Sequence, residues 1–354
     1  MQRAERTSAM PGLPGRAFAI AFPVLLAACV ATGSPGPPLS TLGRLTAIDD
    51  SFDQTVAADA RIEKVAEGFT WAEGPAWVHD GSYLLFTDVP ENTLYRWKQG
   101  DGLSVFLKPS GLDGPDPGTL REAGANGLYA EPGDTVLLAD SGTRLVARLD
   151  PKTKRKTTLA ATFQGKRFNS PNDVVRHSGG AVFFTDPPYG LKGLDDSPAK
   201  ELAFNGVYRI DAGGVVQLLD DSLSFPNGIA LSPDERTLYV SNSDPARPVW
   251  MAYSLDGQGT VMDKRVFADA SDLLGEGVPG LPDGMAVSDD GKIFATGPGG
   301  VLVFEASGKR LGRIETGSAV SNCTFGDDGN TLYMTSHTFV ARIRVNATGL
   351  GFKR

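Results

Sequence analysis

Six short segments of this sequence repeat one pattern, and the repetition restricts the fold more than any other feature. Each segment begins with a carboxylate or amide residue and continues into a short apolar stretch, a turn and a second apolar stretch. We call these first residues the openers: Glu73, Asn126, Asn172, Asn227, Asp283 and Asn322. The second stretches end at a nearly constant distance from their openers, at Asp88, Asp140, Asp186, Asn242, Gly297 and Ser336. So fixed a spacing indicates a repeated supersecondary unit.

The segments that follow the hairpins add a second pair of strands to each repeat. Examples are GVYRIDAGGVVQLLD at 206–220 and VLVFEASGKRLGRIETG at 301–317. Residues 61–354 divide into six repeats of about 49 residues, the size of a four-stranded propeller blade. The sequence therefore predicts an all-β fold, a six-bladed β-propeller of four-stranded blades. A β-sandwich is the structural alternative, but it gives no reason for six registered openers.

The two ends of the repeat region predict how the ring closes. The stretch RIEKVAEGF at 61–69 reads as a lone strand before the first opener, and FVARIRV at 339–345 reads as the third strand of the last repeat. The last blade therefore lacks an outer strand that the N-terminal strand can supply. Such closure removes the open edge of an unclosed ring.

The pair Asn227-Gly228 has two readings. Asn-Gly beside alternating apolar residues is a strong hairpin signal. In this repeat, however, the turn chemistry lies further on, at 232–235, in the sequence SPDE. We therefore interpret Asn227 as an opener rather than as a turn residue.

The stretch before the repeats, 1–60, differs from them in character. Three arginines precede the apolar run AFAIAFPVLLAA, which is too short to span a bilayer and is typical of an export signal. We expect residues 1–28 to be a signal peptide, 29–60 a flexible linker and 61–354 the propeller domain. LAAC, ending at Cys29, resembles the lipobox of bacterial lipoproteins, although an ordinary cleaved signal is the alternative. Either way the expected location is outside the cytoplasm, in the periplasm or anchored to a membrane through Cys29.

Charge, cysteine content and missing motifs exclude several classes of partner and enzyme. The formal net charge of −8, with no long block of like charge, argues against nucleic acid. Cys323 is the one other cysteine and is interpreted as a small core residue rather than as a nucleophile. The chain also lacks the G-x-S-x-G elbow of serine hydrolases and the P-loop and dinucleotide fingerprints.

The openers are the candidate metal ligands. Innermost strands line the central channel of a propeller, so residues at one position of six blades converge on its axis. Such residues can simply bind water, but two carboxylates among four amides form a hard, oxygen-rich, anionic site that suits calcium best. Magnesium and manganese are second choices. Zinc is the least favoured, because none of the three histidines is an opener.

Several stretches resemble the signature motifs of the gluconolactonase, regucalcin (senescence marker protein) and lactonase-like family. They are EGPAW, SPNDV, FTDPPYG, FPNGIALS and LPDGMAV, and they occur in the family's order across residues 61–345. The resemblance implies a six-bladed propeller with one catalytic divalent metal, usually calcium, at the channel mouth. It carries over onto four openers as the metal-binding set: Glu73, Asn172, Asn227 and Asp283.

The remaining openers match the family less closely. For Asn126, in GANGL, the resemblance suggests a place in the substrate pocket. Asn322 is followed by Cys323 where most other repeats have Gly, and the family gives it no metal role, so we interpret it as a packing or water-binding residue.

Segments that follow the second strand of each hairpin return to the metal end of the channel. Tyr189 and His337 lie in such segments and are candidate substrate contacts, although a plain loop role is equally compatible with the sequence. Insertions at 111–125, 187–205 and 274–280 fall on the same side. We expect them to shape a rim that selects the substrate.

The predicted reaction is hydrolysis of a sugar lactone such as glucono-1,5-lactone. A bound calcium ion polarises the carbonyl, and a carboxylate activates water. The family resemblance makes Asp283 the first choice for this base, and Glu73 is the alternative. Two other readings stay open: a phosphotriesterase similar to the diisopropyl-fluorophosphatases, and a non-catalytic binding propeller with structural calcium. The sequence does not define an oligomeric state.

Overall fold

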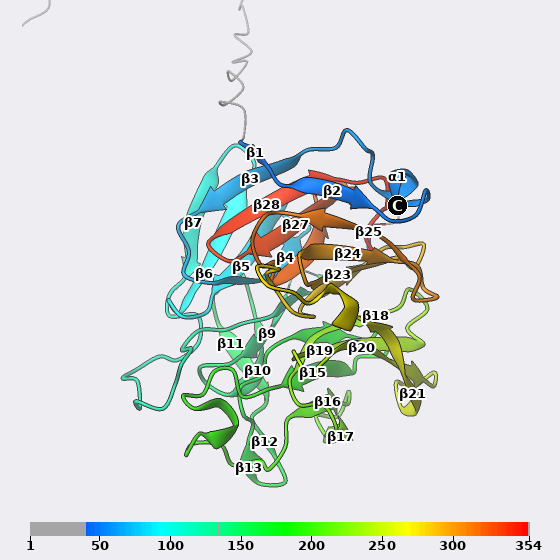
Figure 1. The fold of residues 1–354 in the computed structure, drawn as a ribbon. Helices are drawn as coiled ribbons and strands as arrows, with labels where there is room; N and C mark the ends of the chain where they lie inside the picture. Colours follow the sequence, from blue (N-terminus) through cyan, green and yellow to red (C-terminus); the bar gives the residue numbers. More distant parts are fainter. Residues whose placement is uncertain (1–39, 134, 353–354) are drawn as a thin grey trace, which may run out of the picture. The chain divides into compact units, whose positions relative to one another are not determined.

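The computed structural model describes residues 40–133 and 135–352, and its regular structure consists almost entirely of antiparallel strands (Figure 1). The expected signal peptide and Cys29 lie outside the described residues. Blade 1 consists of β4 (Ala72–Val78), β5 (Tyr83–Asp88), β6 (Thr93–Lys98) and β7 (Gly102–Leu107). Blade 2 consists of β8 (Leu128–Ala130), β9 (Val136–Asp140), β10 (Leu145–Leu149) and β11 (Lys156–Ala160). Blade 3 consists of β14 (Val174–Arg176), β15 (Val182–Asp186), β16 (Gly206–Ile210) and β17 (Val216–Asp220).

Blade 4 consists of β18 (Pro226–Leu231), β19 (Thr237–Asp244), β20 (Arg247–Leu255) and β21 (Val261–Asp269). Blade 5 consists of β22 (Met285–Val287), β23 (Ile293–Gly297), β24 (Gly300–Phe304) and β25 (Arg310–Glu315). Blade 6 consists of β26 (Asn322–Gly326), β27 (Thr331–Ser336), β28 (Phe339–Arg344) and β3 (Ile62–Glu67). The other elements are β1 (Thr41–Leu42), β2 (Arg44–Ala47), α1 (Phe52–Thr55), a small hairpin of β12 (Thr162–Phe163) and β13 (Lys166–Arg167), and two 3-10 turns, η1 (Leu194–Asp196) and η2 (Ser271–Leu273).

The inner strands of the six blades form a closed ring. Each contacts the inner strand of both neighbours, in the order β4, β8, β14, β18, β22, β26 and back to β4. The predicted six-bladed propeller of four-stranded blades is therefore confirmed. The predicted closure is confirmed as well, because β3 pairs with β28 and places Glu67 opposite Phe339.

Residues 41–56 are part of the folded domain, so the domain begins earlier than the expected boundary at Arg61. β1 adds a fifth strand to blade 6 by pairing with β3, and β2 adds a fifth strand to blade 5 by pairing with β25. The short helix α1 then buries Phe52 against blades 5 and 6. We call residues 41–56 the N-terminal strap. The strap strands β1 and β2 are two and four residues long, too short for a sustained period, and β2 pairs with a strand near the other end of the chain, in blade 5.

The hydrophobic core is divided among the six blade interfaces. Each of six clusters of buried side chains lies between two adjacent blades, as the cluster of Leu137, Ala139, Val174 and Phe184 does between blades 2 and 3. Successive residues of a strand point to opposite faces. Leu138 accordingly packs toward blade 1, while its two neighbours pack toward blade 3. Buried apolar strands thus bind each blade to both neighbours and fix the inner strands around the axis.

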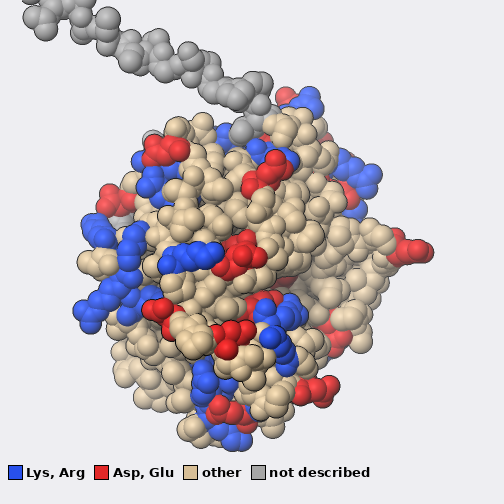
Figure 2. Space-filling view, turned by 90° about the vertical axis from the view of Figure 1, so that its left-hand side faces the viewer, with Lys and Arg blue, Asp and Glu red and all other residues tan. Residues whose placement is uncertain are grey.

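Among the described residues, no helix has the length and apolar character needed to cross a membrane. Acidic and basic side chains are interspersed over the face that Figure 2 shows.

Candidate active site

One cavity at the end of the channel collects five of the six openers. Its volume is about 320 Å³, and it opens to solvent. The side chains and backbone that line it are Trp71, Glu73, Arg121, Glu122, Asn126, Asn172, Tyr189, Asn227, Ser243, Gly280, Leu281, Asp283, Ala319 and Val320. The predicted metal-binding set of Glu73, Asn172, Asn227 and Asp283 therefore lies in a single cavity, together with Asn126.

Six hydroxyl groups hold the openers at the axis. In each blade a Ser or Thr donates a hydrogen bond to the backbone carbonyl of the next blade's opener or of the residue before it. The six pairs are Thr87 with Asn126, Ser141 with Pro171, Thr185 with Asn227, Ser243 with Pro282, Thr296 with Ser321, and Ser321 with Ala72. These bonds run from blade to blade around the whole ring, so they link the position of each opener to that of its neighbours.

Glycine follows four of the six openers because the backbones of adjacent blades nearly touch there. A Cβ atom on Gly228 would lie 2.3 Å from the carbonyl oxygen of Asp283, and one on Gly74 would lie 2.0 Å from the carbonyl oxygen of Asn126. The pair Asn227-Gly228 lies inside β18, which confirms that it is not a hairpin turn. The pairing register of β18 shifts between Pro226 and Ile229, and such a bulge re-aims the side chains within it.

Two carboxylates of the cavity, those of Glu73 and Asp283, lie close enough to repel each other. Burial raises the pKa of Glu73, and the nearby charge of Asp173 raises it further. Burial and then the charge of Glu73 raise the pKa of Asp283. Neither carboxylate forms an ion pair with a basic side chain among the described residues. A cation between them would offset both the desolvation and the repulsion.

The amides supply neutral oxygen atoms beside this pair. Asn227 donates its amide nitrogen to Oγ of Ser243 at 2.9 Å, which leaves its Oδ1 available. Asn172 is 4% exposed, and its side chain lines the same cavity. Within the described residues no cluster of three His, Cys, Asp or Glu side chains is arranged to hold a metal. Two carboxylates with two amide oxygens therefore suit a hard cation such as calcium better than zinc.

Glu73 is held more firmly than Asp283. Its Oε1 accepts a hydrogen bond of 3.3 Å from Nε1 of Trp71, and its Oε2 accepts one of 3.0 Å from the backbone of Gly74. Asp283 accepts a hydrogen bond from the backbone of Gly284. The freer carboxylate is the better placed of the two to turn toward a water molecule and take its proton.

All three predicted rim insertions reach the cavity. The first contributes Arg121 and Glu122, the second Tyr189, and the third Gly280. Tyr189 stacks on Phe225 with ring centroids 5.7 Å apart, and burial raises the pKa of its hydroxyl group. The predicted substrate contact His337 is outside the lining. Its exposed ring packs on Trp71 with centroids 5.3 Å apart, so it meets the cavity wall only through that indole.

Four lining side chains with polar groups were not predicted from the sequence: Trp71, Arg121, Glu122 and Ser243. Trp71 lies two residues before its opener, and Ser243 directly follows the predicted end of a second strand, so the repeat itself could have pointed to both. Arg121 and Glu122 lie in an insertion with no counterpart in other blades, and no repeat position marks them.

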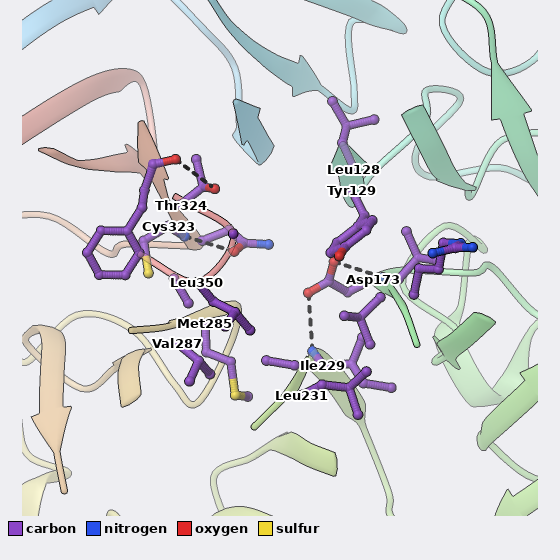
Figure 3. Close-up of a pocket in the computed structure, with 18 of the residues that line it drawn as sticks. Leu128, Tyr129, Asp173, Ile229, Leu231, Met285, Val287, Cys323, Thr324 and Leu350 are labelled. Carbon is purple, nitrogen blue, oxygen red and sulfur yellow. Dashed lines mark hydrogen bonds between the residues drawn. The ribbon is translucent and has the colours of Figure 1, made fainter. Parts of the chain in front are cut away.

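The opposite end of the channel has a different character. Its cavity is lined mostly by apolar side chains, including Ile229, Met285 and Leu350, and Asp173 points into it (Figure 3). The Asp173 carboxylate accepts hydrogen bonds from the backbone of Ile229 and from the side chain of Asn322. Asn322 thus bonds to Asp173 within the scaffold, whereas the sequence predicted a packing or water-binding residue. Cys323 is buried in the core between blades 5 and 6, and burial raises its pKa, which confirms its predicted packing role.

Comparison with known proteins agrees with this architecture. The family model described as the SMP-30/Gluconolactonase/LRE-like region matches residues 71–338. The chain belongs to this family. The matched range includes every opener. A gluconolactonase from Zymomonas mobilis is 43% identical over 314 residues, which are 88% of this chain and 88% of that protein.

Solved structures of the family have the same fold. The structure of a gluconolactonase from Xanthomonas campestris covers 87% of this chain and 98% of its own, with a TM-score of 0.74 and 29% identity. A regucalcin from Agrobacterium tumefaciens, described as a calcium-binding protein, covers 80% and 92% with a TM-score of 0.63 and 20% identity. The second likeness concerns the fold alone.

Proposed function

We propose that this protein is a calcium-dependent lactonase that hydrolyses sugar lactones such as glucono-1,5-lactone to the aldonic acid. The observation that carries the proposal is the cavity in which two mutually repelling carboxylates, Glu73 and Asp283, lie beside two amide side chains. Membership of the family and the 43% identity to a gluconolactonase support the substrate class.

Four side chains fit the divalent cation: Glu73, Asn172, Asn227 and Asp283. A calcium ion bound there supplies a positive charge that polarises the lactone carbonyl and favours the oxyanion. Trp71 and Gly74 fix the carboxylate of Glu73, and Ser243 fixes the amide of Asn227, so these ligands are oriented before substrate arrives.

Asp283 serves as the general base in this proposal. Its carboxylate takes a proton from water while the water oxygen attacks the carbonyl carbon. The tetrahedral intermediate then collapses, the bond between the carbonyl carbon and the ring oxygen breaks, and the proton passes to the departing oxygen. The product is an open-chain hydroxy acid, which ionises to the carboxylate.

The deciding experiment follows acid release from glucono-1,5-lactone, corrected for spontaneous ring opening. The purified protein is stripped with chelator and then given calcium, beside the variants Asp283→Asn and Asp263→Asn. Asp263 is exposed on the outer strand of blade 4 and serves as the matched control. We expect activity to disappear with chelator, return with calcium, and be lost in the Asp283 variant only.

Three results would contradict the proposal. Activity that persists in chelator would show that hydrolysis does not depend on a metal ion. If the calcium-loaded protein matches the uncatalysed rate on lactones but hydrolyses diisopropyl fluorophosphate, the electrophile is phosphorus. If it hydrolyses neither substrate, the reading that remains is a non-catalytic binding propeller.

A further inference from the structure

We propose that Arg121 and Glu122 together form a recognition element for the hydroxyl groups of an uncharged, polyhydroxylated lactone. The inference rests on the proposed function, because it names the substrate class that the same cavity would select. Neither residue occupies a repeat position, and both reach the cavity from the insertion at 111–125.

The backbone that carries this pair is fastened across two blades. Leu120 and Leu191 form an antiparallel bridge between the insertions of blades 2 and 3. On either side of it, the backbone nitrogen of Arg121 donates to the carbonyl of Gly190, and that of Lys192 donates to Thr119, both at 2.8 Å. Leu120 is 4% exposed and Leu191 is fully buried. The two insertions thus form one anchored unit that presents Tyr189, Arg121 and Glu122 to the cavity.

The side chains of the pair leave hydrogen-bonding capacity unused. Nε and Nη2 of Arg121 donate to the same oxygen, Oε1 of Glu122, at 3.1 and 2.6 Å. Among the described residues, Nη1 of Arg121 and Oε2 of Glu122 have no hydrogen-bond partner. One group is a donor and the other an acceptor. Adjacent hydroxyls of a sugar ring match this arrangement, since each hydroxyl can donate to the carboxylate or accept from the guanidinium.

The exposure of the two side chains shows how the pair is oriented in the cavity. The side chain of Arg121 is 51% exposed, whereas that of Glu122 is 9% exposed, so the pair runs from the mouth toward the interior. Glu122 lines the same cavity as Glu73, Tyr189 and Asp283. A ring whose carbonyl lies between Glu73 and Asp283 therefore has its hydroxyl-bearing carbons within reach of the pair.

Charge excludes the alternative that Arg121 selects an anionic substrate. Arg121 is the one Lys or Arg side chain among the described residues that line the cavity, and Glu122 already neutralises it. With a cation balancing Glu73 and Asp283, a phosphorylated or carboxylated lactone would find no uncompensated basic side chain to pair with in the cavity. The cavity therefore favours neutral polyols.

Binding of stable lactams tests the inference independently of turnover. Gluconolactam, in which an N–H replaces the ring oxygen, carries the sugar hydroxyls, and δ-valerolactam lacks them. Calorimetry on calcium-loaded protein compares the wild type with Arg121→Gln, Glu122→Gln and the control Arg155→Gln, an exposed arginine that does not line the cavity. We expect the first two variants to weaken gluconolactam binding at least tenfold, to leave the weak binding of δ-valerolactam within threefold, and the control to match the wild type.

Parallel assays on glucono-1,5-lactone separate this inference from the proposed function. If the protein hydrolyses the lactone but neither substitution, at Arg121 or Glu122, changes gluconolactam affinity, the inference is overturned and the proposed function stands. Absence of hydrolysis together with Arg121-dependent lactam binding would overturn the function and keep the recognition element. Equal losses for both lactams in either variant would show a disturbed cavity rather than hydroxyl recognition, and that result also overturns the inference. If gluconolactam does not bind the wild type, the inference fails.

Discussion

The hydroxyl group of Thr185 in blade 3 donates a hydrogen bond of 2.6 Å to the backbone carbonyl of Asn227 in blade 4. The same hydroxyl accepts a bond of 3.2 Å from the backbone nitrogen of Asp173. Thr185 is fully buried, so neither backbone group can turn to water if the hydroxyl is removed. One side chain thus positions the backbone beside two of the openers, Asn172 and Asn227.

Thr185→Val removes this hydroxyl while preserving the shape of the side chain. We expect the free energy of unfolding to fall by about 1–3 kcal/mol, because two buried polar groups lose their partner. Calcium affinity should fall too, because Asn227 loses a backbone restraint. Urea denaturation and calcium titration measure the two effects. Thr185→Ser keeps the hydroxyl and should retain calcium affinity; equal losses in both variants would show that packing, not the hydrogen bond, positions Asn227.

The openers could be predicted from the sequence because the blade repeat is local. An opener, its turn and its second strand follow one another directly in the chain, and the second strands of five blades end at the predicted residues, among them Asp186 and Gly297. In blade 4 the strand continues to Asp244, two residues beyond the prediction. Pairing with β20 extends it over Ser243, which contacts the site.

Other features depend on partners that are distant in the chain. The N-terminal strap is one case, since Arg44 pairs with Glu315 in blade 5 across 271 residues. The pair Arg121 and Glu122 is another, since its place in the cavity depends on the bridge between two insertions. Neither insertion contains a repeat or a periodic apolar pattern. Such contacts follow from the assembled ring and leave no local signal in the sequence.

The stability of the calcium-free protein should fall as pH rises through the neutral range. Burial and neighbouring charge raise the pKa of Glu73 from 4.5 to about 8, and that of Asp283 also rises. The unfolded chain releases these protons at lower pH than the folded chain does, so rising pH favours unfolding between about pH 4.5 and pH 8. Urea denaturation in chelator at several pH values measures the slope.

Glu73→Gln is the matched variant for this prediction. It removes one titrating carboxylate and its repulsion on Asp283, so the decline of stability with pH should become shallower. Saturating calcium should reverse the decline in the wild type, because the ion binds the ionised carboxylates of the folded state. An identical slope in wild type and variant would show that other buried acids, such as Asp186, cause the dependence.

Trp71→Phe tests how the first opener is oriented. The substitution keeps an aromatic ring against His337 but removes the indole donor that bonds Oε1 of Glu73. A hydrogen bond of this kind contributes about 1 kcal/mol, so we expect calcium to bind about fivefold more weakly. Calorimetric titration measures the change. His337→Ala removes only the ring that packs on the indole and should alter calcium affinity less; an equal or larger effect would mean that this ring contact, rather than the hydrogen bond, orients Glu73.

Phe52→Ala tests whether the N-terminal strap belongs to the folded domain. Phe52 is 1% exposed, and its ring packs against Gly312 in β25, where a Cβ atom would lie 2.3 Å from the ring. Truncating a buried Phe costs about 3–5 kcal/mol, so the variant should unfold at markedly lower urea concentration. Ile48→Ala, at a strap position that is 57% exposed, should stay within about 0.5 kcal/mol of the wild type. If both variants unfold with the wild-type midpoint, the strap adds nothing to the stability of blades 5 and 6, and the domain begins near Arg61 as the sequence alone indicated.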